Sequence, residues 1–140
     1  MNLLDTLQIS ASGLTSQRVR LQTIASNMAN ARTTRTEAGG PYQRKLPVFE
    51  ARQLDAFGDA LEQAMSEPIV TEITSDDTPP VRVFDPSHPD ADADGYVAYP
   101  AINLMEEMVD LMSTSRTFEA NTKVVETTRM MANEALAIGR

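Results

Sequence analysis

The last quarter of the chain decides its fold. Residues 101–138 read AINLMEEMVDLMSTSRTFEANTKVVETTRMMANEALAI. Positions seven apart stay on one face of an α-helix, because the helical repeat is close to half of seven. This spacing predicts a helix from about Ala101 to Ile138 that is closed by Gly139. The heptad row consists of Leu104, Leu111, Phe118, Val125 and Ala132, and members of it are followed four residues later by Met108, Ser115, Thr122 and Leu136.

The start of the chain carries a matching pattern. We expect a helix from residue 3 to about residue 31, ending where Thr33, Thr34 and the turn at Gly39-Gly40-Pro41 interrupt it. Gly13 is its weak point, because Gly in a helix interior costs about 1 kcal/mol relative to Ala. The heptad row of this helix consists of Leu7, Leu14, Leu21 and Met28, flanked on the same side by Leu4, Ala11 and Ala25.

The segment between the two helices has a different character. Residues 42–49 alternate loosely and could form a strand, and residues 69–74 and 81–84 are β-branched runs typical of strands. Residues 50–65 have a helical composition with a thin apolar face, so they form either a short helix or a disordered stretch.

The sequence therefore predicts a mainly α protein with a small β-rich middle and an elongated subunit. Long N- and C-terminal helices, in residues 1–32 and 101–140, would form one discontinuous domain that contributes to a coiled-coil layer. Residues 33–100 would form the β-rich and loop middle segment.

Composition limits the class of protein. The chain has 140 residues, the length of one domain, and it has no Cys. The absence of Cys excludes disulfides, Cys-ligated zinc and thiol catalysis. No apolar stretch reaches the length of a membrane span, and the N-terminus lacks the features of a secretory signal.

The net charge of −8 is unevenly distributed along the chain. Residues 1–48 hold six basic and two acidic residues, whereas residues 49–99 hold two basic and twelve acidic residues. An acidic protein gains nothing by releasing counterions from nucleic acid, so we expect no nucleic-acid partner. The acidic middle is interpreted as solvated surface, or alternatively as a surface that meets basic N-terminal helices of neighbouring subunits.

Two features could suggest chemistry. The run from Asp90 to Gly95 has carboxylates at alternate positions, like the first half of a calcium loop, but Ala101 stands where the bidentate Glu belongs. An acidic calcium-binding module stays open as an alternative function. His88 lies in a proline-rich turn without the spacing of a catalytic triad. We therefore expect no enzyme activity, no cofactor, no metal and no small-molecule substrate.

Polar residues interrupt both heptad rows, among them Gln17, Ser115 and Asn121. Polar groups on a buried seam cost free energy unless they find partners. A two-helix hairpin of this kind is marginal, since helices in proteins draw most of their stability from packing. The pattern indicates an assembly protein whose helix ends are frayed or disordered in the free monomer and become ordered against neighbouring subunits.

Both halves of the chain contain recognisable short motifs, which are Ser10 to Leu14, Ser26 to Asn30, Pro41-Tyr42 with Arg44-Lys45, Gly95 to Val97, Pro100, Glu107 to Val109, Met112-Ser113, Ser115-Arg116 and Ala120-Asn121. Together they resemble the bacterial flagellar axial proteins, the rod and hook family. They are most similar to its proximal rod branch in the basal body, the C component. Ala101 departs from the Asn that this family usually has after the Pro. Hook and distal rod proteins insert larger middle domains than this chain has.

The resemblance implies a structural subunit of the flagellar proximal rod, with another rod component as the nearest alternative. Such subunits are exported without a cleaved signal peptide by the flagellar type III export apparatus. They stack helically into a hollow rod that transmits motor torque and encloses the export channel. The implied partners are copies of the chain, other rod proteins, the membrane ring and rod adaptor at the base, and the export apparatus. The implied location is the basal body, spanning the periplasm.

We expect subunits to contact one another through both helices. Asn27, Asn30, Arg116 and Asn121 are interpreted as polar pins that set subunit register, with solvated helix surface as the alternative interpretation. One side of the contact would be formed by Leu7, Leu14, Leu21 and Met28, and the other by Leu104, Met108, Leu111, Phe118 and Val125.

If the helix ends depend on neighbours, dilute monomer should show only part of the helix content of the assembled chain and should melt over a broad temperature range. Far-UV circular dichroism of dilute protein measures both quantities. A sharp cooperative melt from near-full helix content would contradict this expectation.

Overall fold

The computed structural model of the chain describes residues 3–53 and 66–138. In this part of the chain, two long helices come before and after a β-rich middle segment in the sequence. The expectation of a mainly helical protein with long terminal helices is therefore confirmed. In chain order the elements are α1 (Leu3–Ala29), β1 (Lys45–Gln53), β2 (Ser66–Ser75), β3 (Val81–Phe84), β4 (Tyr96–Tyr99) and α2 (Leu104–Ile138).

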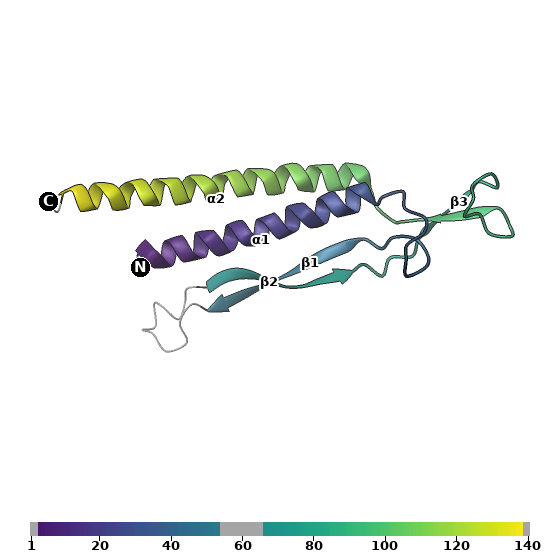
Figure 1. Cartoon of the computed structure of the whole chain (residues 1–140), viewed down its shortest axis with the longest axis horizontal. Coiled ribbons are helices and arrows are strands. Elements are labelled where there is room, and N and C mark those ends of the chain that lie inside the picture. Colours follow the sequence, from purple (N-terminus) through teal and green to yellow (C-terminus); the bar gives the residue numbers. More distant parts are fainter. Residues whose placement is uncertain (1–2, 54–65, 139–140) are drawn as a thin grey trace.

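Helix α1 lies between two neighbours. Figure 1 shows α2 along one side of α1 and the β1–β2 hairpin along the other. The two helices run antiparallel, so the start of α1 lies at the same end as the last turns of α2. The hairpin of β3 and β4 extends from the opposite end of the helix pair. Neither helix in the described segments is long and apolar enough to cross a membrane.

The seam between α1 and α2 repeats every seven residues. Glu107 hydrogen-bonds Asn27, and Asn121 lies against Gly13. Fourteen residues separate the two members of each helix, so two heptads of α1 match two heptads of α2.

The most buried row of α2 is not the apolar one. It lies four residues before Leu111, Phe118, Val125 and Ala132, and these four apolar side chains are only half-buried. The row four residues after the apolar one is mixed in its burial, since Met108 and Leu136 are exposed and Ser115 and Thr122 are half-buried. The row that faces α1 is Glu107, Thr114, Asn121 and Thr128.

The serine- and glycine-containing stretch of α1 is where the helix is packed on both sides. The hydroxyls of Ser12 and Ser16 both donate to the carbonyl oxygen of Pro68 in β2, at 2.6 and 2.8 Å. On the other side, a Cβ added to Gly13 would lie 3.1 Å from Nδ2 of Asn121. Gly13 is therefore the residue that lets α2 approach closely, which explains a glycine in the middle of a helix.

Helix α2 begins three residues later than the sequence suggested. Oδ1 of Asn103 accepts the N–H of Met105 at 3.1 Å, which makes Asn103 the N-cap. The carbonyl of Asn103 accepts the N–H of Glu107 and starts the helical hydrogen bonds. Residues 101–103 thus lead into the helix from Pro100 and do not belong to it.

The middle segment forms two antiparallel hairpins, β1–β2 and β3–β4. Strand β1 continues through residue 53, so the expectation of a helix or disorder over residues 50–65 is wrong for 50–53, while 54–65 lie outside the described residues. Strand β4 was not expected. It follows Gly95, whose φ of +81° allows the turn from Asp92 back toward β3.

We predict that Gly13→Ala gives no net stabilisation, because the new methyl group meets Asn121 and offsets the gain in helix propensity. In an Asn121→Ala background this contact is absent, and Gly13→Ala should stabilise the chain by about 1 kcal/mol. Urea unfolding followed by circular dichroism measures the four free energies of this cycle. An equal gain in both backgrounds would show that the helices do not approach closely here.

Candidate subunit interface

A buried group of polar side chains joins the end of α1, the start of β1 and the start of α2. Asn27, which is 2% exposed, donates from Nδ2 to the carbonyl of Lys45 and accepts the N–H of Lys45 on Oδ1, both at 2.9 Å. This two-way pairing resembles one rung of a β-ladder. It attaches the first residue of β1 to the last turns of α1.

The same group reaches α2 through Glu107, which is 1% exposed. Nε and Nη2 of Arg44 each lie 2.6 Å from Oε1 of Glu107. Nδ2 of Asn27 donates to Oε2 at 3.4 Å, and the hydroxyl of Tyr42 donates to Oδ1 of Asn27 at 3.1 Å. We call Asn27, Tyr42, Arg44 and Glu107 the polar clamp.

The clamp satisfies a carboxylate that would otherwise be costly to bury. An unpaired buried charge destabilises a protein strongly, whereas a paired and hydrogen-bonded one can be tolerated. Both oxygens of Glu107 have donors, and Arg44 keeps partial solvent contact, with 26% of its side chain exposed. Among the described residues, no buried side-chain nitrogen or oxygen lacks a partner. The clamp therefore holds the three elements in one geometry.

Asn30 also bonds within the chain. Its Nδ2 donates to the carbonyl of Ser26 at 2.9 Å, and its Oδ1 accepts the hydroxyl of Thr33 at 3.2 Å, so it closes the end of α1. The expected contacts of Asn27 and Asn30 with neighbouring subunits stay a prediction, because the contacts seen here serve the subunit's own fold.

The remaining candidate interface residues divide by exposure. Leu104 and Met108 are 40% and 46% exposed, and Arg116 is exposed as well. Asn121 is half-buried against Gly13. The half-buried apolar residues, which flank the seam, are Leu7, Leu14, Leu21, Met28, Leu111, Phe118 and Val125. The expected contacts of all these residues with neighbouring subunits stay a prediction.

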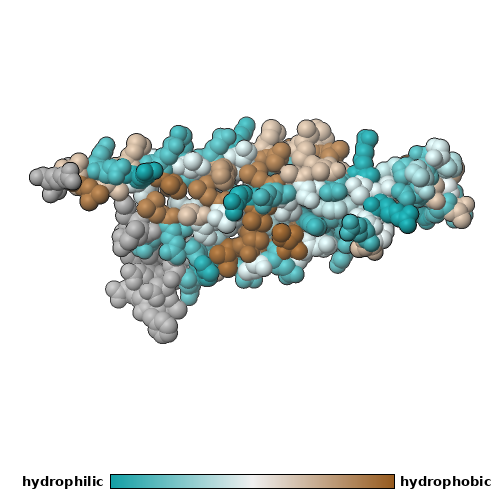
Figure 2. Space-filling view, in the orientation of Figure 1, coloured by the Kyte–Doolittle hydropathy of each residue, from teal (hydrophilic) through white to brown (hydrophobic). Residues whose placement is uncertain are grey.

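A large apolar surface is exposed at the start of α2. Met105, Met108, Val109 and Met112 follow the spacing of one helix face, and they are 69%, 46%, 58% and 57% exposed. Methionine side chains are flexible and polarisable, so they adapt well to an uneven partner surface. Figure 2 shows hydrophobic residues at the surface along the helix pair and over the β1–β2 hairpin.

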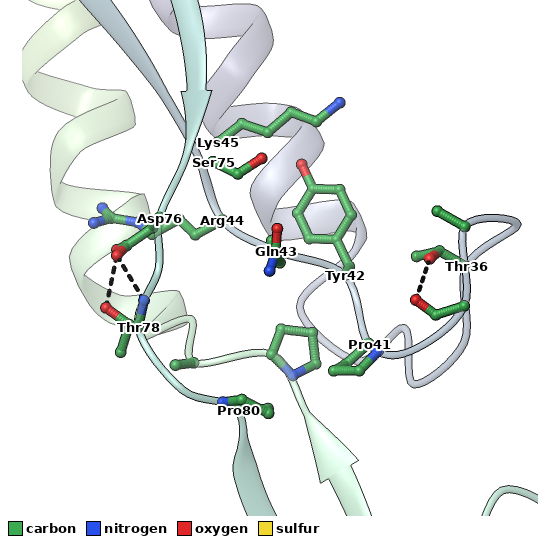
Figure 3. Close-up of a pocket in the computed structure, with 14 residues that line it drawn as sticks. Thr36, Pro41, Tyr42, Gln43, Arg44, Lys45, Ser75, Asp76, Thr78 and Pro80 are labelled. Carbon is green, nitrogen blue, oxygen red and sulfur yellow. Dashed lines mark hydrogen bonds between the residues drawn. The ribbon is translucent and has the colours of Figure 1, made fainter.

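One exposed pocket is lined by both polar and apolar residues and offers no convergent chemistry. Its cavity of about 480 Å³ lies between the loop before β1, the end of β2 and residues 100–101, which precede α2. In Figure 3, Tyr42 and Arg44 leave this loop in different directions. Tyr42 hydrogen-bonds Asn27 and Arg44 binds Glu107. The hydroxyl and N–H of Thr78 donate to Asp76 and lower the pKa of that carboxyl. The pocket therefore lies where the loop before β1, the end of β2 and the segment before α2 meet.

The acidic run at 90–94 is engaged with donors of its own chain. Oδ1 of Asp92 accepts the N–H of Tyr96 at 2.8 Å and that of Asp94 at 3.0 Å, and Arg82 binds Oδ2. The hydrogen bond from Tyr96 is the main cause that lowers the pKa of Asp92. Asp90 accepts the hydroxyl of Thr34 at 2.8 Å. Within the described segments, no three His, Cys, Asp or Glu side chains are placed to hold a metal ion.

Sequence reasoning did not assign the roles of Tyr42, Arg44 and Glu107, although each belonged to a recognised motif. One signal was available for Glu107. It lies four residues before Leu111, where a carboxylate on the inner side of a helix needs a cationic partner. The identity of that partner could not be read from the sequence, because Arg44 is separated from Glu107 by 63 residues.

Two family models match the ends of the chain. Residues 7–35 match the model described as "Flagella basal body rod protein". Residues 93–138 match the model described as "Flagellar basal body rod FlgEFG protein C-terminal". The matched segments contain most of α1 and all of β4 and α2, which are the elements that carry the clamp's Asn27 and Glu107. The helices thus define an axial protein of the flagellar rod class.

Full-length relatives narrow the class. The chain is 39% identical to "Flagellar basal-body rod protein FlgC" of Bacillus subtilis and 38% identical to that of Salmonella typhimurium, in both cases over 100% of each chain. It is 38% identical to the protein of the same name in Borreliella burgdorferi, over 99% of this chain and 98% of the relative. The chain belongs to the FlgC family of flagellar basal-body rod proteins.

Two asparagines of one motif should differ sharply in their effect on stability. Asn27→Ala leaves the backbone N–H and carbonyl of Lys45 and one oxygen of Glu107 without partners, so we predict a loss of about 3 kcal/mol in the free energy of unfolding. Asn30→Ala, the matched control, removes only helix-end hydrogen bonds and should cost about 1 kcal/mol. Urea unfolding of both variants measures this difference, and equal losses would contradict the role of the clamp.

Proposed function

We propose that this chain is a structural subunit of the proximal rod of the bacterial flagellum, and that its role is mechanical and not catalytic. In this proposal the subunit is elongated, and its α1 and α2 contribute to an inner coiled-coil layer that surrounds the export channel. The family relationship over the full chain supports the rod assignment. The arrangement of the layer rests on the two antiparallel helices.

The observation that carries the proposal is the small size of the subunit's own core. In the described segments only Ile24 and Val97 are buried hydrophobic residues, at 5% and 1% exposure. A domain of this size normally buries most of its apolar surface, and contiguous exposed apolar patches mark interaction sites. Large exposed hydrophobic residues line the start of α2, both hairpins and the last turns of α2. Such a subunit gains stability when neighbours cover these faces.

The proposed partners follow from this surface and from the family. Copies of the chain and other rod proteins would cover the helices, and the membrane ring and rod adaptor would lie at the base. The flagellar type III export apparatus would deliver the chain without cleavage of a signal peptide, and a chain without Cys suits passage as an unfolded polypeptide. The proposed location is the basal body, where the rod spans the periplasm.

Torque transmission fits the arrangement of the elements. Many helices that lie along one axis resist twisting together, because each contact is repeated along the rod. A heterologous interface of this kind continues from subunit to subunit without closing on itself. Within each subunit the clamp connects α1 to α2, so twist applied to one helix passes to the other.

The calcium-binding alternative receives no support from the fold. Asp92 accepts two backbone N–H groups and binds Arg82, and Asp90 binds Thr34. A calcium loop requires these oxygens to converge on one point. In this turn Asp92 closes the β3–β4 hairpin, and Asp90 joins the turn to the loop after α1.

We predict that cells lacking this chain cannot build a hook or filament and do not swim, and that expression of the chain restores both. Cryo-electron microscopy of purified basal bodies should place the chain between the membrane ring and the distal rod. Normal hooks and swimming in its absence, or its absence from the purified basal bodies, would contradict the proposed function.

A further inference from the structure

The outer face of α2 consists of two heptad rows that point away from α1. One row is Met105, Met112 and Glu119, and all three side chains are exposed. The other row begins with Met108 and continues through Ser115, which is half-buried. The N-terminal part of this face, which contains Met105, Met108 and Met112, is therefore apolar. Glu119 follows Met112 by one heptad.

The outer face of α1 has the complementary character. Its exposed rows contain Ala25 and Ala29 near the end of the helix and Arg18 about two turns earlier. The two alanines leave room for large side chains of a partner helix. Among the described residues, neither Arg18 nor Glu119 forms an ion pair within the chain.

The two faces match in antiparallel register. Seven residues separate Arg18 from Ala25, and seven separate Glu119 from Met112. When Arg18 of one copy lies beside Glu119 of another, Met112 therefore lies over Ala25. In the same register, eleven residues from each charged residue, Met108 lies over Ala29. In the register that brings the two charges together, large side chains therefore pack over small ones.

The charged pair distinguishes this register from its neighbours. Arg18 and Glu119 are both exposed. Opposite charges favour this antiparallel register, because a shift by one heptad would separate Arg18 from Glu119.

The register also agrees with the pairing inside each subunit. Within the chain, Gly13 lies against Asn121 and Asn27 against Glu107, which places Arg18 at the level of Arg116. The contact between copies differs from this internal register by only three residues, or about 4.5 Å along the helix. A neighbouring copy can therefore lie side by side with the first at a small axial shift.

We propose that the outer face of α2 binds the outer face of α1 of a second copy of this chain, in antiparallel register with Arg18 beside Glu119 and Ala25 beneath Met112. The inference rests on the proposed rod function. Each copy then uses α2 toward one neighbour and α1 toward the other, which gives a heterologous contact that propagates. Arg116 lies on the same face of α2 as Glu119, and in this register it comes to the level of Leu21 of the neighbour.

Cross-linking of cysteine variants in basal bodies tests this contact, and the chain offers no Cys of its own to interfere. Ala25→Cys and Met112→Cys chains are co-expressed in cells that lack the natural chain, and purified basal bodies are treated with a short thiol-specific cross-linker. We expect a cross-linked dimer. The matched control pairs Ala25→Cys with Ser113→Cys, because residue 113 is exposed at the same level of α2 but points to another side.

The outcomes separate the two proposals. Basal bodies that contain both cysteine chains but give no dimer, or as much dimer with the control pair, would overturn the inference and leave the rod function standing. Absence of the natural chain from basal bodies would overturn both.

Charge reversal tests the contact between Arg18 and Glu119 independently if the cysteine variants do not assemble. Arg18→Glu should abolish swimming, and adding Glu119→Arg should restore it, because the pair is re-formed with opposite signs. Circular dichroism of the purified single variant should match that of the natural chain, because Arg18 makes no ion pair with residues 3–53 or 66–138 of its own subunit. Failure of the double variant to swim would overturn the inference.

Discussion

The structure of this subunit depends on a polar interaction at the point where three elements meet. Asn27 pairs with both backbone groups of Lys45, and Glu107 receives Arg44 and Asn27. Without these bonds the buried carboxylate and the first residue of β1 would lose their partners, and the cost would be large in a chain with so small an apolar core. The clamp therefore sets the angle of α2 against α1 and the position of the β1–β2 hairpin.

A polar seam has a consequence for assembly. The row of α2 that faces α1 consists of Glu107, Thr114, Asn121 and Thr128, so the large apolar side chains of this helix are displaced to its flanks and outer face. Hydrogen bonds give the subunit a defined geometry, while in the proposed rod most of the hydrophobic free energy is realised when neighbours cover the helices. This division suits a subunit that is delivered singly and becomes stable in a polymer.

The long helices could be predicted because heptad spacing is a local property of the sequence. Leu111, Phe118 and Val125 do lie beside the seam, and the strands at Ile69 and Val81 were indicated by β-branched runs. The side of the helix that is most buried could not be predicted from hydrophobicity. A close approach at Gly13 and a partnered Glu107 put small and polar residues inside, and both depend on residues distant in sequence.

The same limit applies to the candidate interface. Apolar rows indicate that a helix packs against partners. A single sequence does not distinguish the row that packs within the subunit from the row that contacts neighbouring subunits. The hydrogen bonds of Asn27 lie within the chain, and its expected contact with neighbouring subunits stays a prediction. Strand β4 is only four residues long and lies between a glycine turn and Pro100, so its β-character was not recognised. Its pairing with β3 becomes evident only when Gly95 reverses the chain.

The central claim is that the outer face of α2 is exposed in the free subunit and covered in the rod. Oxidative footprinting of methionines, followed by mass spectrometry, measures this directly in free protein and in purified basal bodies. We expect Met105, Met108 and Met112 to be oxidised readily in the free chain and to be strongly protected in the basal body. Equal oxidation of these three methionines in both states would show that neighbouring subunits do not cover this face.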